Sequence, residues 1–198
     1  PSAAIHATTA RLSKRRTPPD AVAEPTLPDV LEPKLNIVFC APNEGAGRTR
    51  HYYAKPGNRF WPTLFDIGLT SERLTPTDYL KLPQQRLGLI ELARFAGYED
   101  QDLPHYFDRE SLLKKIERYQ PRVLAFTSKH AGECFLGHRL DYGPQVATIG
   151  STVLYVLPSP SGSASRYWDI RQWERLAQLV KRDSDDENPN ERCVSRAV

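Results

Sequence analysis

Short apolar runs and stretches of helical periodicity alternate along the chain, and each pattern predicts its own kind of element. The apolar runs predict buried strands at residues 35–40, 87–92, 123–126, 146–149 and 153–157. Apolar residues at helical spacing predict helices over residues 111–119, 129–136 and 167–180. A further helix follows Asn58, which can cap it, and its apolar positions extend to Leu69.

This alternation also predicts the fold class and the extent of the domain. Strands that alternate with helices are typical of a mostly parallel sheet covered on both faces. We therefore expect an α/β fold, a three-layer α/β/α sandwich, with residues 34–182 as one domain. Residues 1–33 and 183–198 have the composition of disordered tails. A basic cluster at residues 11–16 leaves open a second interpretation of the first tail, as a DNA tether or an import signal.

Composition narrows the class of protein. Of the 198 residues, 39% are hydrophobic and 26% are charged, which is typical of a soluble globular domain. The net charge of +3 does not by itself indicate a nucleic-acid ligand. No apolar run approaches the roughly 18 residues that a membrane span needs. We expect no membrane partner, and a location in the bacterial cytoplasm near the nucleoid, or in the nucleus of a eukaryote.

The cysteines argue against a disulfide framework. Cys40, Cys134 and Cys193 are three in number and lie far apart in the sequence, which indicates a reducing compartment. Three cysteines are one too few for a four-cysteine iron–sulfur cluster, and no C-x-x-C pair occurs. We expect no iron–sulfur cluster, no other metal and no cofactor.

The loop after the first predicted strand, residues 41–57 (the first loop), mixes basic and aromatic side chains. Ligands of parallel α/β sheets bind at the carboxyl ends of the strands, where this loop begins. Cations bind phosphates and aromatic rings stack on bases, so the mixture suits a nucleic-acid strand. The alternative is a solvated loop whose tyrosines cap the core. The side chains concerned are Arg48, Arg50, His51, Tyr52, Tyr53 and Lys55.

A second loop, residues 157–168, follows the last predicted strand. It reads Leu157-Pro-Ser-Pro-Ser-Gly-Ser-Ala-Ser-Arg-Tyr-Trp168, with prolines that stiffen it and small hydroxyl residues. Backbone N–H groups and hydroxyls of this kind bind phosphates well. A plain loop with a serine that caps the last helix is the alternative, and the loop alone favours it.

Five segments in fixed order carry a family resemblance. The first two are Phe39-Cys-Ala-Pro-Asn-Glu-Gly45 and Lys55-Pro-Gly-Asn-Arg-Phe-Trp61, and the others lie at residues 86–89, 119–129 and 149–162. They are similar to the G-I-N-P-G, H-P-x-N-R-F-W and N-P-S-G or M-P-S-S motifs, and the segments between them, of the mismatch-specific uracil-DNA and thymine-DNA glycosylases. The likeness to this branch of the uracil-DNA glycosylase superfamily spans about residues 35–180.

The resemblance implies a DNA-repair enzyme with a three-layer α/β fold. It implies base flipping, because the glycosidic bond cannot be reached inside a duplex. Asn43 matches the asparagine that positions the attacking water, and Tyr53 matches an aromatic that stacks on the flipped base. Residues 159–166 match the loop that grips phosphate and fills the vacated place in the helix. The implied partner is DNA that contains uracil or a mismatch, bound by a monomer.

The first motif departs from the family's pattern at two positions. Glu44 stands where the family usually has proline, and its carboxylate could act as a general base or form a salt bridge with Arg48 or Arg50. Pro42 has no N–H, so any base contact that the backbone makes there in relatives is lost. Asn43 orients water but is a very weak base, and alone it predicts modest turnover.

The second motif departs as well. Ser159 replaces the family's asparagine or methionine, so the family's base selectivity does not carry over to this position. The usual wedge position falls among the small side chains of residues 163–165, and Arg166 is the candidate substitute, because arginine stacks and binds phosphate. The alternative for Arg166 is a surface salt bridge with Asp169. The expected phosphate contacts are made by Arg48, Arg50, Lys55, Ser161, Gly162, Ser163 and Arg166.

His51 is a further chemical candidate. The segment Arg48-Thr-Arg-His51 is superficially similar to the arginine-rich loop of an iron–sulfur branch of the superfamily that traps abasic DNA covalently. The cysteine count argues against that branch. Near the sugar, His51 could act as a nucleophile or stabilise the leaving base, whereas a lone loop histidine is more often polar surface.

Three functions compete at this point. The first is a monofunctional glycosylase that releases uracil by water attack and leaves an abasic site. Its substrates could include other damaged or mismatched bases. No lysine is clearly placed as a Schiff-base nucleophile, so lyase chemistry is not expected. The second is a lesion- or abasic-site-binding protein with little turnover, which the altered first motif motivates. A nucleotide-binding enzyme is the third, but neither G-x-x-x-x-G-K-[ST] nor G-x-G-x-x-G occurs.

Overall fold

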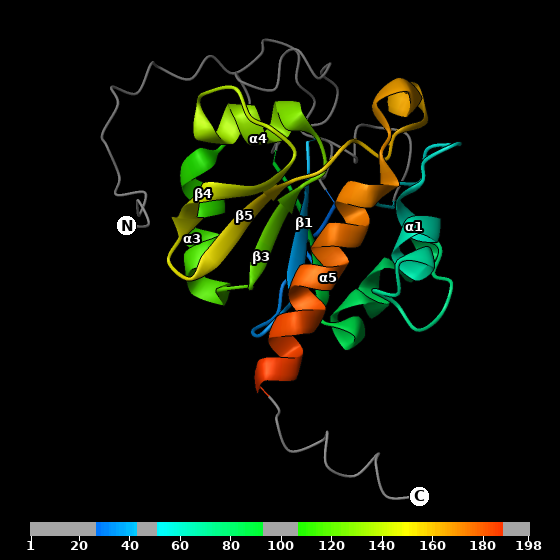
Figure 1. The fold of residues 1–198 in the computed structure, drawn as a ribbon, viewed down its shortest axis with the longest axis horizontal. Coiled ribbons are helices and arrows are strands. Elements are labelled where there is room, and N and C mark those ends of the chain that lie inside the picture. Colours follow the sequence, from blue (N-terminus) through cyan, green and yellow to red (C-terminus); the bar gives the residue numbers. More distant parts are fainter. Residues whose placement is uncertain (1–26, 43–50, 93–106, 188–198) are drawn as a thin grey trace, which may run out of the picture.

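A mostly parallel sheet of five strands forms the middle layer of the chain (Figure 1). The computed structural model describes residues 27–42, 51–92 and 107–187. Among these residues the sheet order is β2-β1-β3-β5-β4, and only β4 runs antiparallel to its neighbour. The strands are β1 (Ile37–Ala41), β2 (Leu87–Glu91), β3 (Val123–Phe126), β4 (Gly143–Ile149) and β5 (Thr152–Val156).

Helices cover both faces of this sheet. In Figure 1, α3 and α4 lie on one side of the strands, and α1 and α5 lie on the other. The predicted three-layer α/β/α sandwich is therefore confirmed. The helices are α1 (Phe60–Asp66), α3 (Arg109–Tyr119), α4 (Lys129–Leu136) and α5 (Ile170–Glu187), with the 3-10 segments η1 (Pro76–Gln85) and η3 (Gly162–Tyr167).

Alternate side chains of each strand enter separate cores, as the two-residue period of a strand requires. On β1, Ile37 and Phe39 pack toward α1 and α5, while Val38 and Cys40 pack toward α3 and α4. Every residue of β1 is buried, which explains why the strand reads as a continuous apolar run. Trp173 of α5 stacks on Phe39 with ring centroids 5.8 Å apart and so holds that helix on the sheet.

Two helices begin and end where local sequence signals place them. The Ser128 hydroxyl accepts a hydrogen bond from the N–H of Ala131 (3.1 Å), and Gly137 ends α4 with a φ of 80°. The Asp108 carboxylate accepts from the N–H of Ser111 (3.1 Å) at the start of α3. Pro121 follows the end of that helix.

The last helix differs from its prediction at the N-terminal end. Residues 162–167 form the 3-10 turn η3, and Trp168 is extended (φ −67°, ψ 124°), so α5 begins only at Ile170. The apolar spacing continued through this break because Trp168 packs on Trp173, with ring centroids 5.7 Å apart. Helical periodicity therefore located the buried face but not the start of the helix.

Two other boundaries also differ. The helix after Asn58 ends at Asp66, and Gly68, with a φ of 69°, takes the chain out before Leu69. The Asn58 side-chain oxygen accepts from the N–H of Phe60 (2.9 Å), so the asparagine does bond the start of α1. Strand β4 begins at Gly143, three residues earlier than predicted, because Gly143 pairs with Val156 ahead of an irregular stretch.

Structure also extends past the expected domain boundaries. The backbone of Val30 pairs with Leu89 in an antiparallel bridge, and the Val30 side chain is buried in the core. At the other end, α5 continues to Glu187. Because of the Val30 bridge, residues 27–33 pack with the domain, although the composition of residues 1–33 is typical of a tail.

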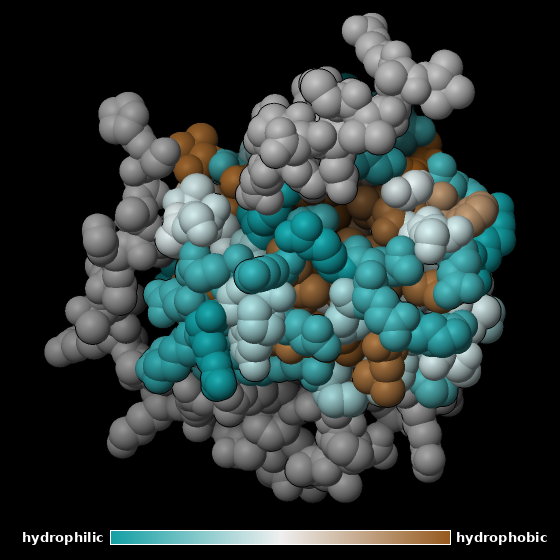
Figure 2. Space-filling model, turned by 90° about the horizontal axis from the view of Figure 1, so that it is seen from below, coloured by the Kyte–Doolittle hydropathy of each residue, from teal (hydrophilic) through white to brown (hydrophobic). Residues whose placement is uncertain are grey.

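Figures 1 and 2 show the orientation of the sheet and the face below it. In Figure 1 the carboxyl ends of the parallel strands lie at the upper edge, together with α4 and η3. Figure 2 shows the molecule from below, where most of the described residues at the surface are hydrophilic, with small hydrophobic patches between them. In the part of the chain that the structure describes, no helix is both long and apolar enough to span a membrane.

Candidate functional site

The first and second loops meet at the carboxyl edge of the sheet. The N–H of Arg59 donates to the carbonyl oxygen of Pro160 at 2.8 Å. Gly57 and Gly162 face each other so closely that a Cβ on Gly162 would lie 3.2 Å from the Gly57 carbonyl oxygen. Gly57 has a φ of 76°, which an L side chain rarely adopts. Both glycines thus allow two loops that are a hundred residues apart in sequence to form one surface.

Tyr53 is held in an unusual conformation at this junction. Its φ is 53°, in the left-handed region where a bulky residue is an outlier. One face of its ring stacks on Phe60, with centroids 3.8 Å apart and planes 16° from parallel. Only 2% of Tyr53 is exposed. The ring is therefore fixed, and in this structure almost none of its surface is open to a ligand.

The Tyr53 hydroxyl connects this ring to the sheet. It lies 3.0 Å from the Thr127 hydroxyl, and the Thr127 hydroxyl donates to the carbonyl oxygen of Cys40 at 3.2 Å. Thr127 follows β3 directly, and its N–H donates to the same carbonyl at 3.1 Å. Sequence reasoning missed Thr127, although a buried polar residue right after a strand of the parallel sheet is the signal that points to it.

Tyr52, the neighbouring aromatic, has a structural role instead. Its side chain is buried, and its carbonyl oxygen accepts from the indole N–H of Trp61 (3.0 Å). Burial raises the pKa of the Tyr52 phenol, and the nearby carboxylates of Glu91 and Asp29 raise it further. Both tyrosines of the first loop are thus buried in the same core cluster, with ring centroids 6.3 Å apart, as the alternative of tyrosines that cap the core predicts.

His51 and Pro42 lie at the two ends of the gap in the described first loop. Pro42 is half-buried directly after β1, and His51 is half-buried with its ring 5.8 Å from that of Tyr79. Asn43, Glu44, Arg48 and Arg50 lie outside the described residues, so their predicted roles stay predictions. Lys55 is described and is exposed on the short segment that precedes Gly57.

Cys40 does not supply a nucleophile in this neighbourhood. It is fully buried, and burial raises the pKa of its thiol far above the ordinary value, with a further increase from Asp29 and Glu91. A thiol that stays protonated is a poor nucleophile. Its contribution to the site is the carbonyl oxygen that Thr127 contacts.

The serines of the second loop bond with one another. The Ser159 hydroxyl accepts from the N–H of Ser161 at 3.3 Å, and the Ser161 and Ser163 hydroxyls lie 2.9 Å apart. Ser159, Ser161 and Gly162 are half-buried, whereas Ser163 and Arg166 are exposed. Hydroxyls and N–H groups therefore line a stiff turn that lies against Gly57, an arrangement suited to a phosphate.

Two aromatic contacts fix the base of this turn. The Arg59 guanidinium lies 5.5 Å from the Trp168 ring, and the indole N–H of Trp173 donates to the Pro158 carbonyl (3.1 Å). The Nη1 of Arg59 is buried and has no hydrogen-bond partner among the described residues. The expected alternative for Arg166 is wrong: Asp169 instead pairs with Arg171 at 2.9 Å.

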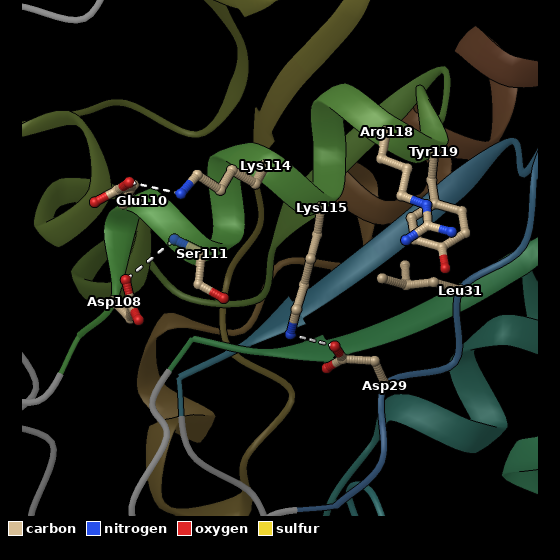
Figure 3. Close-up of a pocket in the computed structure, with 9 residues that line it drawn as sticks. All are labelled: Asp29, Leu31, Asp108, Glu110, Ser111, Lys114, Lys115, Arg118 and Tyr119. Atoms are coloured by element: carbon tan, nitrogen blue, oxygen red, sulfur yellow. Dashed lines mark hydrogen bonds and ion pairs between the residues drawn. The ribbon is translucent and has the colours of Figure 1, made fainter.

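A cavity elsewhere on the molecule is separate from both loops. It lies between α3 and the segment that leads to β1, and Figure 3 shows two ion pairs among its charged side chains. Lys115 bonds to Asp29, and Lys114 bonds to Glu110 at 2.7 Å. None of the site residues predicted from the sequence lines it. Among the described residues, no group of three or more His, Cys, Asp or Glu side chains could hold a metal ion.

A comparison with protein families agrees with this geometry. A family model described as "Uracil DNA glycosylase superfamily" matches residues 28–180. The match covers more than three quarters of the chain. It includes the Val30 bridge, all five strands, both loops and most of α5.

Proposed function

This chain belongs to the uracil DNA glycosylase superfamily, and on that basis we propose that it is a monofunctional glycosylase that removes uracil from DNA. The superfamily acts on DNA by hydrolysing N-glycosidic bonds. The proposal adds the substrate base, its release by water attack after flipping, and an abasic site as the product. A related mismatched or damaged base that fits the same pocket would be released in the same way.

The observation that carries the proposal is the fixed ring of Tyr53 at the junction of the two loops. Phe60 supports one face of the ring at 3.8 Å, and the Thr127 hydroxyl fixes its edge at 3.0 Å. Because Tyr53 is only 2% exposed, a flipped pyrimidine would reach the other face only after the groups that now cover it move aside, and stacking there would gain roughly 1–3 kcal/mol. Because the ring cannot turn, it would also set the plane of the base, and with it the direction of the glycosidic bond.

The chemistry then needs a placed water and stabilisation of two opposite charges. As the glycosidic bond breaks, positive charge grows on the sugar and negative charge grows on the departing base. We assign the orientation of the water to the Asn43 side chain, which follows Pro42 at the carboxyl end of β1. Glu44 would accept the proton of that water as a general base if the dry pocket raises its pKa.

His51 is the candidate for the departing base. It lies two residues before Tyr53, on the same segment as the proposed platform. An imidazole there can donate a hydrogen bond to the uracil anion as charge develops on it. Pro42 and Ser159 complete the proposed base pocket from the two strand ends.

DNA would be held by the turn of the second loop and by the cations of the first. The N–H groups and hydroxyls of Ser161, Gly162 and Ser163 suit one phosphate next to the flipped nucleotide. The exposed side chains of Lys55 and Arg166 suit phosphates on either side, and Arg48 and Arg50 belong to the same proposed set. No base-specific contact is needed for this part of the binding.

The proposal is tested by excision from a labelled oligonucleotide that carries one uracil. Single strands, U·G duplexes and U·A duplexes are incubated with the whole chain. Each sample is then divided, and only one half is treated with alkali. We expect breaks only after alkali, since a monofunctional glycosylase leaves the strand intact at the abasic site. Asn43→Ala and Glu44→Ala should both slow the reaction. Tight binding of abasic DNA without any excision would instead identify a lesion-binding protein.

A further inference from the structure

Two consecutive aromatic residues at the end of η3 lie in opposite environments. Trp168 is anchored between Arg59 and Trp173, with contacts of 5.5 and 5.7 Å to the guanidinium and to the ring centroid. Tyr167 is 65% exposed on the same turn. Trp168 attaches the turn to the domain. Tyr167 makes no such attachment, because most of its side chain is exposed to solvent.

A second aromatic and a cation lie on the β4 side of the same edge. The ammonium group of Lys129 lies 4.5 Å from the centroid of the Tyr142 ring. Lys129 begins α4, just after β3, and Tyr142 directly precedes β4. The pairing of Gly143 with Val156 places Tyr142 beside the carboxyl end of β5, where the second loop departs.

Tyr167 lies at the same carboxyl edge of the sheet, because the second loop that carries it leaves β5 beside Tyr142. Burial raises the pKa of the Tyr142 phenol, and a negative charge on Tyr167 would raise it further. Lys129 forms a weak ion pair with Asp141. The Asp141 side chain is fully exposed, and its carboxylate lies 3.7 Å from the Lys129 ammonium. An exposed pair of this kind contributes little and can exchange for a phosphate.

We propose that Lys129, Tyr142 and Tyr167 form a DNA-contacting surface beside the excision site, which binds the strand next to the flipped nucleotide. Lys129 contacts a phosphate, the Tyr142 ring 4.5 Å away orients the Lys129 ammonium, and Tyr167 stacks on a base that loses its neighbour when the nucleotide leaves the helix. Tyr167 thereby supplies the large side chain that residues 163–165 lack. This inference rests on the proposed function for the position of the flipped nucleotide.

The experiment measures binding of the whole chain to a duplex with a tetrahydrofuran abasic-site analogue, across a series of salt concentrations. Lys129→Ala should weaken binding and lower the slope of log K against log salt by about 0.9, the value for one phosphate contact. Asp141→Asn should tighten binding, because it removes the competing carboxylate. Tyr167→Ala should weaken binding about 5- to 150-fold without a change in slope, and Tyr167→Phe should bind as the wild type does.

Matched controls keep these effects separate from general changes in charge or exposure. Lys114 is exposed and paired with Glu110 on α3, and Leu80 is exposed to the same extent as Tyr167. Lys114→Ala and Leu80→Ala should bind as the wild type does. A 2-aminopurine next to the analogue reports stacking directly, and its quenching on binding should be lost in Tyr167→Ala.

Excision assays on the same proteins separate the inference from the proposed function. If the wild type excises uracil while the Lys129 and Tyr167 variants match the two controls in binding, the surface is not a DNA contact and the inference is overturned. Should the wild type excise nothing while the variants lose binding as described, the inference stands and the proposed catalysis fails.

Discussion

The hydroxyl of Tyr53 lies 3.0 Å from the hydroxyl of Thr127, and this contact joins the strained first loop to the end of β3. Thr127 also donates to the carbonyl oxygen of Cys40 at the end of β1. Two neighbouring strands thus hold one aromatic ring at the carboxyl edge of the sheet. A residue in a left-handed conformation persists only where its surroundings fix it, and this pair of contacts does so.

Loss of this contact should cost stability and positioning. Thr127→Val removes the hydroxyl that lies 3.0 Å from the buried Tyr53 hydroxyl and should lower the free energy of unfolding by about 1–3 kcal/mol. Tyr53→Phe should cost less, about 0.5–1.5 kcal/mol, because Thr127 keeps its bond to Cys40. The double variant should lose less than the sum of the two, which urea titration measures.

The Tyr53 ring and its hydroxyl should have separable effects on excision. Tyr53→Ala removes the proposed stack and should slow single-turnover release of uracil about 5- to 150-fold, whereas Tyr53→Phe keeps the ring and should be close to the wild type. Tyr155→Phe is a matched control, because it removes a phenol that bonds to the Gln172 carbonyl (3.3 Å) outside both loops. Equal rates for Tyr53→Ala and the wild type would contradict the role of the platform.

Gly162→Ala should separate the two loops. The new Cβ would lie 3.2 Å from the Gly57 carbonyl oxygen, so one of the loops must shift. Because small displacements of positioning groups are costly, we expect excision to fall by up to about 100-fold. Ala164→Gly, two residues along η3, is the control for a general change in the turn. Unchanged activity in Gly162→Ala with a normal melting temperature would show that the contact of the loops does not set the site.

Gly88→Ala should destabilise the edge where residues 27–33 pack. A Cβ at Gly88 would lie 2.5 Å from the Val30 carbonyl oxygen and 2.6 Å from Leu35 Cδ1, closer than real contacts allow. Crowding in a packed core typically costs about 1–3 kcal/mol, and the backbone oxygen cannot turn away as a side chain can. Urea titration measures the loss. A stability equal to that of the wild type would mean that the Val30 bridge is not part of the folded core.

Stability should fall at high pH because of Cys40. Burial raises the pKa of its thiol in the folded chain, while the unfolded chain ionises it near the ordinary value of 9.0. The contribution is therefore fully present below pH 9.0 and is lost as the pH rises above it, because only the unfolded state then releases the proton. Free energies of unfolding at pH 8 and pH 10 should differ less in Cys40→Ala. If the wild type and Cys40→Ala lose the same free energy of unfolding between pH 8 and pH 10, the loss comes from ionisation of the buried tyrosines and not from Cys40.

The sequence predicted elements best where a local signal coincides with the packing. Residues 129–136 were predicted with the correct ends because Ser128 and Gly137 act through bonds to their own helix. The start of α5 was not, because Trp168 continues the apolar spacing through an extended residue. Its packing on Trp173 is a tertiary contact, and periodicity does not distinguish it from a helical turn.

The site shows the same division. The motifs located both loops, since their residue types are set by chemistry within each loop. They did not show that both Tyr52 and Tyr53 are buried, because that burial depends on contacts with Trp61 and Phe60 across a turn. Thr127 could not be assigned from the motifs, since its partners lie 74 and 87 positions away in the sequence.

The most direct test of the central claim is the appearance of free uracil. The whole chain is incubated in excess with duplex DNA that contains one uracil, and free base and alkali-sensitive sites are quantified from the same sample. We predict that uracil and abasic sites appear in equal amounts and at the same rate, and that Asn43→Ala slows both together. DNA that is bound but releases no uracil would contradict the assignment of this chain as a glycosylase.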